Sequence, residues 1–152
     1  MNVLCRRPPA PEALRLYLSR VDLRSANLNG ACLTDAAIRH SNLARAWLAD
    51  ARFDRAELQR TDLRQARAVR ASFVNANLRE AHLGGANLRG ADLRGAELRG
   101  ADMQARDLHE AMLTGALADV NTVWPPKFKL GVIVIVIADG SARPDEPPAP
   151  AI

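Results

Sequence analysis

The chain has 152 residues, of which 48% are hydrophobic but only 4% aromatic, and its 21 basic and 17 acidic side chains leave a net charge of +4. This length predicts one domain, whose narrow core is built from small apolar residues, and two cysteines form neither a disulfide framework nor a zinc spacing. The first twenty residues lack the apolar core of a signal peptide, and the longest apolar run, 132–138, is too short to cross a bilayer, so we expect a cytoplasmic protein without a membrane span.

The first segment, residues 1–15, is predicted to be an N-terminal cap or extension. Its sequence RRPPAPEALR contains a cluster of prolines that excludes regular structure before residue 12. Pro11–Leu14 has the composition that can begin a short helical turn. Such a turn would lie over the start of the structure that follows.

Residues 16–120 repeat a phrase of five residues, most clearly in ANLRGADLRGAELRGAD at 86–102. Anchored on its Leu, the phrase gives a central residue at every fifth position from Leu23 to Ala118, which makes twenty centres without an insertion or deletion. The position two residues before each centre is typically small. Sixteen of these twenty residues are Ala, and the exceptions are Val21, Ser41, Thr61 and Arg106. A buried Arg106 would be very costly, so we expect it to point outward with a local distortion.

A period of five fits neither a helix, which repeats every 3.6 residues, nor a strand, which repeats every two. Two inward residues per phrase form a short extended segment, and the remaining residues turn a corner. Type II turns need a positive φ two places after the centre, which is where six glycines fall: Gly30, Gly85, Gly90, Gly95, Gly100 and Gly115. Four such segments close a square, and the resulting coils of twenty residues hydrogen-bond about 4.8 Å apart. We therefore predict an all-β solenoid of about five coils.

The phrase resembles the motif of the pentapeptide-repeat family, A-(D/N)-L-X-X, which ANLNG, ADLRG, ANLRE and SNLAR match here. The resemblance covers residues 21–120 and implies a right-handed quadrilateral β-helix. Some members of the family are similar to double-stranded DNA in shape and charge, bind DNA gyrase and protect it from inhibitors. The resemblance therefore offers a topoisomerase-binding DNA mimic as one possible function.

Residues 121–138 are predicted to form a C-terminal cap and strand. NTVWPPKF is similar to the T-x-W-P-x-G-F phrase with which the family often ends its repeats, although Lys127 stands where Gly is usual. Trp124 and Phe128 are interpreted as a plug on the last coil, and an aromatic binding site is the alternative. The segment 132–137 alternates Val and Ile, which strongly favours a strand.

Both faces of this strand are apolar, so we expect it either to pack on the last coil or to be covered by a second chain. It would pack by extending the stack or by lying across the plug. If the valines face the coil, Ile133, Ile135 and Ile137 form an exposed row. The simplest closed arrangement is then a homodimer through the C-terminal ends. Residues 139–152 are Pro-rich and predicted to be disordered.

Side chains that could support catalysis or bind a metal are scattered over the walls of the predicted solenoid. His40, His82 and His109 fall on three different faces, and there is no zinc spacing, nucleophile elbow or phosphate loop. Asp62 and His82 share one column, either as a general-base pair or as part of a polar ladder on a solvated wall. The ladder is favoured because no cleft is implied. We predict no enzyme, no catalytic residue, no metal and no cofactor.

Charge is balanced along the repeats, because the four walls of residues 21–120 carry net charges of 0, +1, 0 and 0. A DNA mimic needs an acidic wall and a nucleic-acid-binding protein needs a basic stripe, so both functions are disfavoured. Arg39, Arg79 and Arg99 align in one column, and Trp47 is the one large aromatic residue that faces outward within residues 21–120. These four are candidate contacts for an unidentified protein partner, although a lone exposed Trp needs no partner. The sequence predicts a non-enzymatic scaffold for protein–protein interaction.

Overall fold

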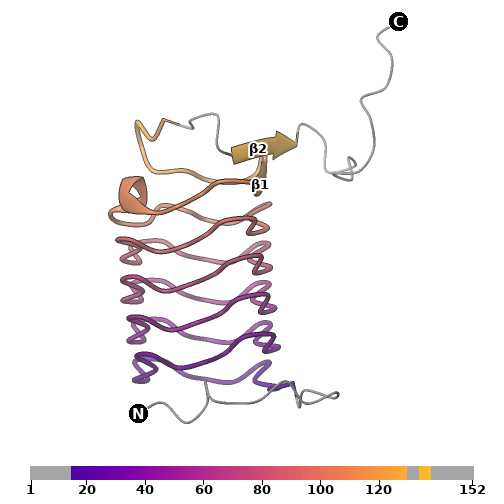
Figure 1. Ribbon diagram of the computed structural model, residues 1–152, viewed down its shortest axis with the longest axis vertical. Coiled ribbons are helices and arrows are strands. Elements are labelled where there is room, and N and C mark those ends of the chain that lie inside the picture. Colours follow the sequence, from indigo (N-terminus) through magenta and orange to yellow (C-terminus); the bar gives the residue numbers. More distant parts are fainter. Residues whose placement is uncertain (1–14, 130–133, 138–152) are drawn as a thin grey trace, which may run out of the picture.

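The period of five becomes a stack of four-sided coils (Figure 1). The computed structural model describes residues 15–129 and the backbone of residues 134–137. Parallel backbone bridges join residues twenty positions apart, from Tyr17 with Ala37 to His82 with Asp102. The predicted right-handed quadrilateral β-helix is confirmed. The predictions for residues 1–14 and for the tail at 139–152 lie outside the described residues.

Each five-residue unit is bonded to the coils on both sides of it. The amide of Leu48 donates to the carbonyl of Arg67 in the next coil (2.8 Å), and the amide of Arg67 donates back to Ala46 (2.9 Å). The corner is closed within the unit, where the amide of Ala51 donates to the carbonyl of Leu48 (3.1 Å). The repeating motif therefore produces the same hydrogen-bond pattern on successive sides of the square, except around Arg106.

The corner residues take the predicted positive φ, and they do so whether or not they are glycine. Gly90 has a φ of 65° and Arg70, one coil earlier, has a φ of 55°. A left-handed conformation costs a residue with a Cβ roughly 1–2 kcal/mol. The backbone hydrogen bonds on both sides of each corner hold these residues in the strained conformation. Such strain persists where the surrounding structure imposes it.

The Asp or Asn that precedes many centres has a structural role that explains its place in the motif. Its side-chain oxygen accepts a hydrogen bond from the backbone amide two residues later, as between Asn42 and Ala44 (3.0 Å) and between Asp62 and Arg64 (3.0 Å). These side chains supply an acceptor for an amide next to the corner, as in an Asx turn.

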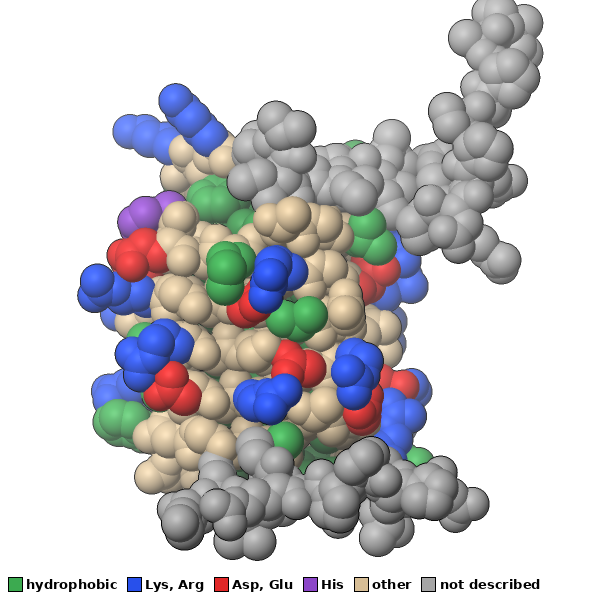
Figure 2. All heavy atoms as spheres, in the orientation of Figure 1, with side chains coloured by type: hydrophobic (Ala, Val, Ile, Leu, Met, Phe, Trp, Pro, Cys, Tyr) green, Lys and Arg blue, Asp and Glu red, His purple; other side chains and the backbone are tan. Residues whose placement is uncertain are grey.

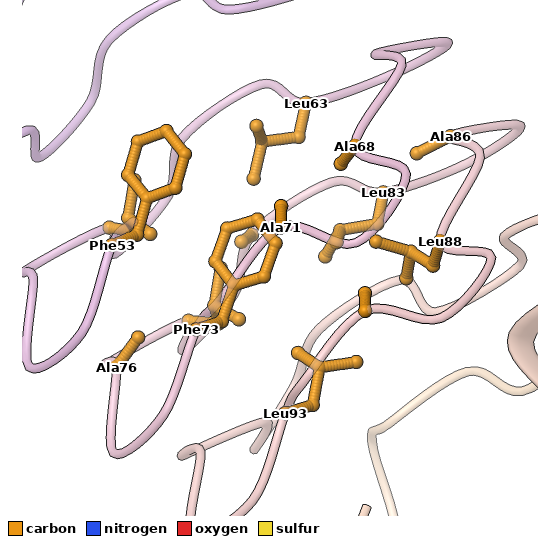
Figure 3. Close-up of a cluster of buried hydrophobic side chains, with 14 of the residues drawn as sticks. Phe53, Leu63, Ala68, Ala71, Phe73, Ala76, Leu83, Ala86, Leu88 and Leu93 are labelled. Atoms are coloured by element: carbon orange, nitrogen blue, oxygen red, sulfur yellow. The ribbon is translucent and has the colours of Figure 1, made fainter. Parts of the chain in front are cut away.

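The inside of the solenoid is filled by the Leu and Ala columns, whose central members are fully buried. Phe53 and Phe73 replace Leu in successive coils, and their rings stack with centroids 5.1 Å apart (Figure 3). The small centre Ala68 lies in the same cluster, so a large side chain and a small one share a coil. The two polar exceptions are satisfied, because Ser41 donates to the carbonyl of Leu18 (2.6 Å) and Thr61 to that of Ile38 (2.8 Å).

The expectation of twenty units without an insertion or deletion is wrong at one place. Asn87 pairs with Arg106 rather than with residue 107, so the unit that starts at Ala101 is one residue short. Ala105 occupies the buried small position with 8% exposure, and Arg106 points outward, as expected of a side chain that cannot be buried unpaired. The short 3-10 helix η2 (Leu108–Glu110) takes up the extra residue and returns Leu108 to the core.

The C-terminal end of the stack is closed by a strand and by an aromatic pair. Strand β1 (Ala116–Asp119) pairs in parallel with β2 (Val134–Ile137), so the second strand extends the stack, which was one of the two expected arrangements (Figure 1). Trp124 and Phe128 stack at 5.4 Å and pack against the core, which confirms the plug. No helix in the described part of the chain is long and apolar enough to span a membrane.

Candidate interaction surfaces

Basic and acidic side chains pair with each other along the outer walls, and Figure 2 shows them side by side on one face of the solenoid. Some arginines bind the aspartate two residues earlier, as in Asp22–Arg24, Asp62–Arg64 and Asp92–Arg94. Others bind a carboxylate in the neighbouring coil, as in Asp35–Arg55, Asp50–Arg70 and Glu80–Arg60. Most of the wall charge is therefore neutralised within the protein.

These ion pairs also bear on whether Asp62 and His82 form a general-base pair or part of a polar ladder. Hydrogen bonds from the Arg64 guanidinium hold the pKa of the Asp62 carboxyl below its ordinary value. Asp62 is thus an ion-paired anion rather than a group poised to take a proton, and His82 is exposed on the wall beside it. The polar-ladder interpretation fits this geometry. Among the described residues, no three His, Cys, Asp or Glu side chains lie together so as to hold a metal ion.

The predicted arginine column is partly occupied by intramolecular contacts. Arg39 binds Glu57 (Nη2 to Oε2, 2.5 Å), and Arg99 binds Glu97 (2.6 Å) with only 19% of its side chain exposed. Arg79 forms no ion pair with a described residue and is exposed. Two of the three arginines are therefore less available to a partner than the sequence suggested.

Trp47, by contrast, belongs to a larger surface that the sequence analysis did not identify. Its side chain is 43% exposed, and the guanidinium carbon of Arg67 lies 3.9 Å from the centre of its ring. Both residues line an open hollow of about 550 Å³, here called the Trp47 surface, together with Ser25, Arg45, Gln65, Ala66, Val69, Gly85, Asn87 and Arg106. Trp47 and Arg67 are twenty residues apart, so the repeat period alone was a signal that they meet.

Comparison with known families matches the description "Pentapeptide repeats", in eight copies, at residues 15–37, 31–67 and 71–105. The chain is a pentapeptide-repeat protein. Comparison of this pentapeptide-repeat protein with curated protein sequences gave no match.

Solved structures of other pentapeptide-repeat proteins are similar to the chain. Rfr23 from the cyanobacterium Cyanothece 51142 is 31% identical over 72% of this chain and 88% of that one, with a TM-score of 0.69. The protein alr5209 from Nostoc Pcc 7120 is 28% identical over 81% of this chain and 86% of its own, with a TM-score of 0.49. QnrB1, a plasmid-mediated fluoroquinolone resistance protein, is 16% identical over 81% and 90%, with a TM-score of 0.38. The structural assignment rests on the likeness to Rfr23.

Proposed function

We propose that this pentapeptide-repeat protein is a non-enzymatic scaffold that binds a partner protein in the cytoplasm through a wall of its solenoid. The observation that carries the proposal is the contrast between the paired charges of the walls and the Trp47 surface. Along most of the described walls the arginines have carboxylates of their own, whereas Trp47 lies exposed beside Arg67 in a hollow that Arg106 also lines. Trp and Arg are the residues that contribute most often to protein–protein binding energy.

A rigid scaffold also fits the backbone. Parallel ladders bond successive coils to each other, with one shift in register at Arg106, so the outward side chains have fixed spacings along the rod. Fixed spacing lowers the entropy lost on binding, because few side chains and no backbone segment of the ladder must be ordered. The shallow hollows among the described residues suit a protein surface better than an enclosed substrate.

The proposal is tested by affinity capture from the native cytoplasm with the intact tagged chain as bait. We expect a partner that untagged protein displaces in proportion to its concentration. A matched bait that carries Arg20→Glu alters an exposed charge outside the Trp47 surface and should retain the partner. If nothing is displaced by the untagged protein, the proposed scaffold function is wrong.

Binding to DNA gyrase is the alternative, and the wall charges argue against it. A mimic of DNA must present uncompensated negative charge along the rod. Here the carboxylates of Asp22, Asp50 and Asp92 are each bound by an arginine. We predict that the protein neither inhibits gyrase supercoiling nor rescues it from a gyrase inhibitor. Inhibition or rescue in a supercoiling assay would favour the alternative over the scaffold proposed above.

A further inference from the structure

The Trp47 surface is organised by one ladder of the solenoid. Trp47, Arg67, Asn87 and Arg106 pair with one another in succession through their backbones, so they stand on four consecutive rungs of the same wall. Rungs are about 4.8 Å apart, which places Arg67 and Arg106 about 10 Å apart along the axis. Arg45 lies at the adjacent corner and lines the same hollow.

The one-residue shift in the repeat determines the charge of this ladder. An unbroken period would put Asp107 on the rung after Asn87, because 107 is twenty residues beyond 87. The short unit instead places Arg106 there, and Asp107 moves to the corner that precedes η2, with a φ of 55°. The wall thus gains a basic side chain at a position where the sequence period predicts an acidic one.

The side chains of the Trp47 surface are basic without an acidic counterpart. Its lining contains Arg45, Arg67 and Arg106 but neither Asp nor Glu. Arg45 donates to the neutral side chain of Gln65 (Nε to Oε1, 3.0 Å), and Arg67 lies over the ring of Trp47. The adjoining hollow differs, because Asp62 lines it together with Arg64, to which it is bound.

We propose that the Trp47 surface binds an acidic, extended segment of a partner protein, whose carboxylates are held by Arg67, Arg106 and Arg45. The inference rests on the proposed scaffold function and names the chemistry of the partner. A guanidinium stacked on Trp keeps its N–H edge free to bind a carboxylate with two hydrogen bonds. Side chains on one face of an extended segment recur about every 6.7 Å, and the long side chains of Arg67 and Arg106, two rungs or about 10 Å apart, can lean together to meet that spacing.

The shape of the hollow suits such a segment. Gly85 occupies the corner beside Gln65, and a Cβ at this position would lie 3.5 Å from Cγ of Gln65. Without a side chain, Gly85 adds no bulk to the hollow that it lines, two coils along from Arg45. A single-stranded nucleic acid is the less suitable occupant, because its binding sites stack bases on several aromatic rings, and here the one ring is covered by Arg67.

The inference is tested with the intact protein and a fluorescein-labelled oligoglutamate peptide, by fluorescence anisotropy at low ionic strength. The controls are an oligoglutamine peptide of the same length and a labelled oligothymidylate. We expect binding of oligoglutamate alone, weakened by added salt. The double variant Arg67→Gln and Arg106→Gln should lose about tenfold in affinity or more, whereas Arg20→Gln, at an exposed arginine outside the hollow, should stay within about twofold of the wild type.

The outcomes separate this inference from the proposed function. Equal losses in the Arg20 variant and the double variant would show unspecific attraction by net charge, and preferred binding of oligothymidylate would show a nucleic-acid site. Either result, or no binding of oligoglutamate, overturns the inference. The double variant is then used as bait in the affinity capture, after circular dichroism has shown an unchanged fold. A partner retained by this bait would leave the scaffold function intact while removing the Trp47 surface as its site.

Discussion

The carboxylate of Asp62 is bound by Arg64, which lies two residues later in the same unit. It accepts hydrogen bonds from the Arg64 backbone amide (3.0 Å), from Nε (2.9 Å) and from Nη2 (2.6 Å). The same arrangement holds Asp92 with Arg94. One aspartate therefore fixes both the corner of the backbone and the position of a basic side chain, and its ionised form is the one that the fold stabilises.

This pair makes the stability of the solenoid depend on pH. Because the pKa of Asp62 is lower in the folded chain than the ordinary value of about 3.9, the pair stabilises the fold above that pH. The contribution is lost as the pH falls through the lower pKa of the folded state. We predict that Asp62→Asn costs about 1 kcal/mol in urea unfolding at neutral pH, and much less in strong acid.

Asn77 provides the control for this experiment. It occupies the same position in its unit and accepts the amide of Arg79 (3.3 Å), but it does not titrate. The free energy lost in Asn77→Ala should be the same at neutral and at acidic pH. Asparagine at position 62 can still accept the backbone amide of Arg64, as Asn42 accepts that of Ala44, so a loss in Asp62→Asn that is independent of pH would contradict a stabilising ion pair.

A second prediction separates the inside of the solenoid from its outside at neighbouring positions. Leu88 is fully buried, so Leu88→Asp places an uncompensated charge in the core and should cost about 4 kcal/mol or more, enough to unfold the chain. Arg89 is exposed and bound to Glu110 (Nε to Oε2, 3.0 Å). Arg89→Asp should cost no more than about 1 kcal/mol. Similar melting temperatures for the two variants would contradict the register.

The fold could be predicted because the apolar residues that must be buried recur with a period of five. Leu and Ala recur at fixed positions, and nearly all other arrangements would expose them. The sequence predicted a distortion at Arg106 but did not show which residue would take its place in the core. The structure buries Ala105 there, because burying the alanine costs far less than burying the arginine. The Trp47 surface was missed for a related reason. Its second basic rung exists only after the shift at Arg106, although the spacing of twenty residues already placed Arg67 on the rung next to Trp47.

A third prediction concerns the turn that connects Trp124 and Phe128 in the aromatic plug. The amide of Phe128 donates to the carbonyl of Pro125 (3.0 Å), and Lys127 between them has a φ of 63°. Since glycine adopts this conformation without the penalty of a Cβ, Lys127→Gly should stabilise the fold by about 1 kcal/mol. Lys129→Gly removes the same charge at a residue without a positive φ, and it should change the stability by less than about 0.5 kcal/mol. Equal effects on thermal unfolding would mean that charge, and not backbone strain, governs the end of the solenoid.

The last prediction concerns self-association at the C-terminal end, which we propose to occur through β2. One edge of β2 pairs with β1, with Ile135 in register with Leu117 and Ile137 with Asp119, while its other edge pairs with no described strand. Ile133 lies outside the described residues. An apolar strand with an open edge is a natural site of pairing, and a two-fold axis closes the assembly after two copies. Light scattering should therefore give the mass of a dimer for the intact chain at tens of micromolar and that of a monomer for Ile135→Lys, with Arg89→Gln as a distant control that stays dimeric. A monomeric mass for the intact chain would mean that the strand completes the solenoid and presents no surface to a second copy.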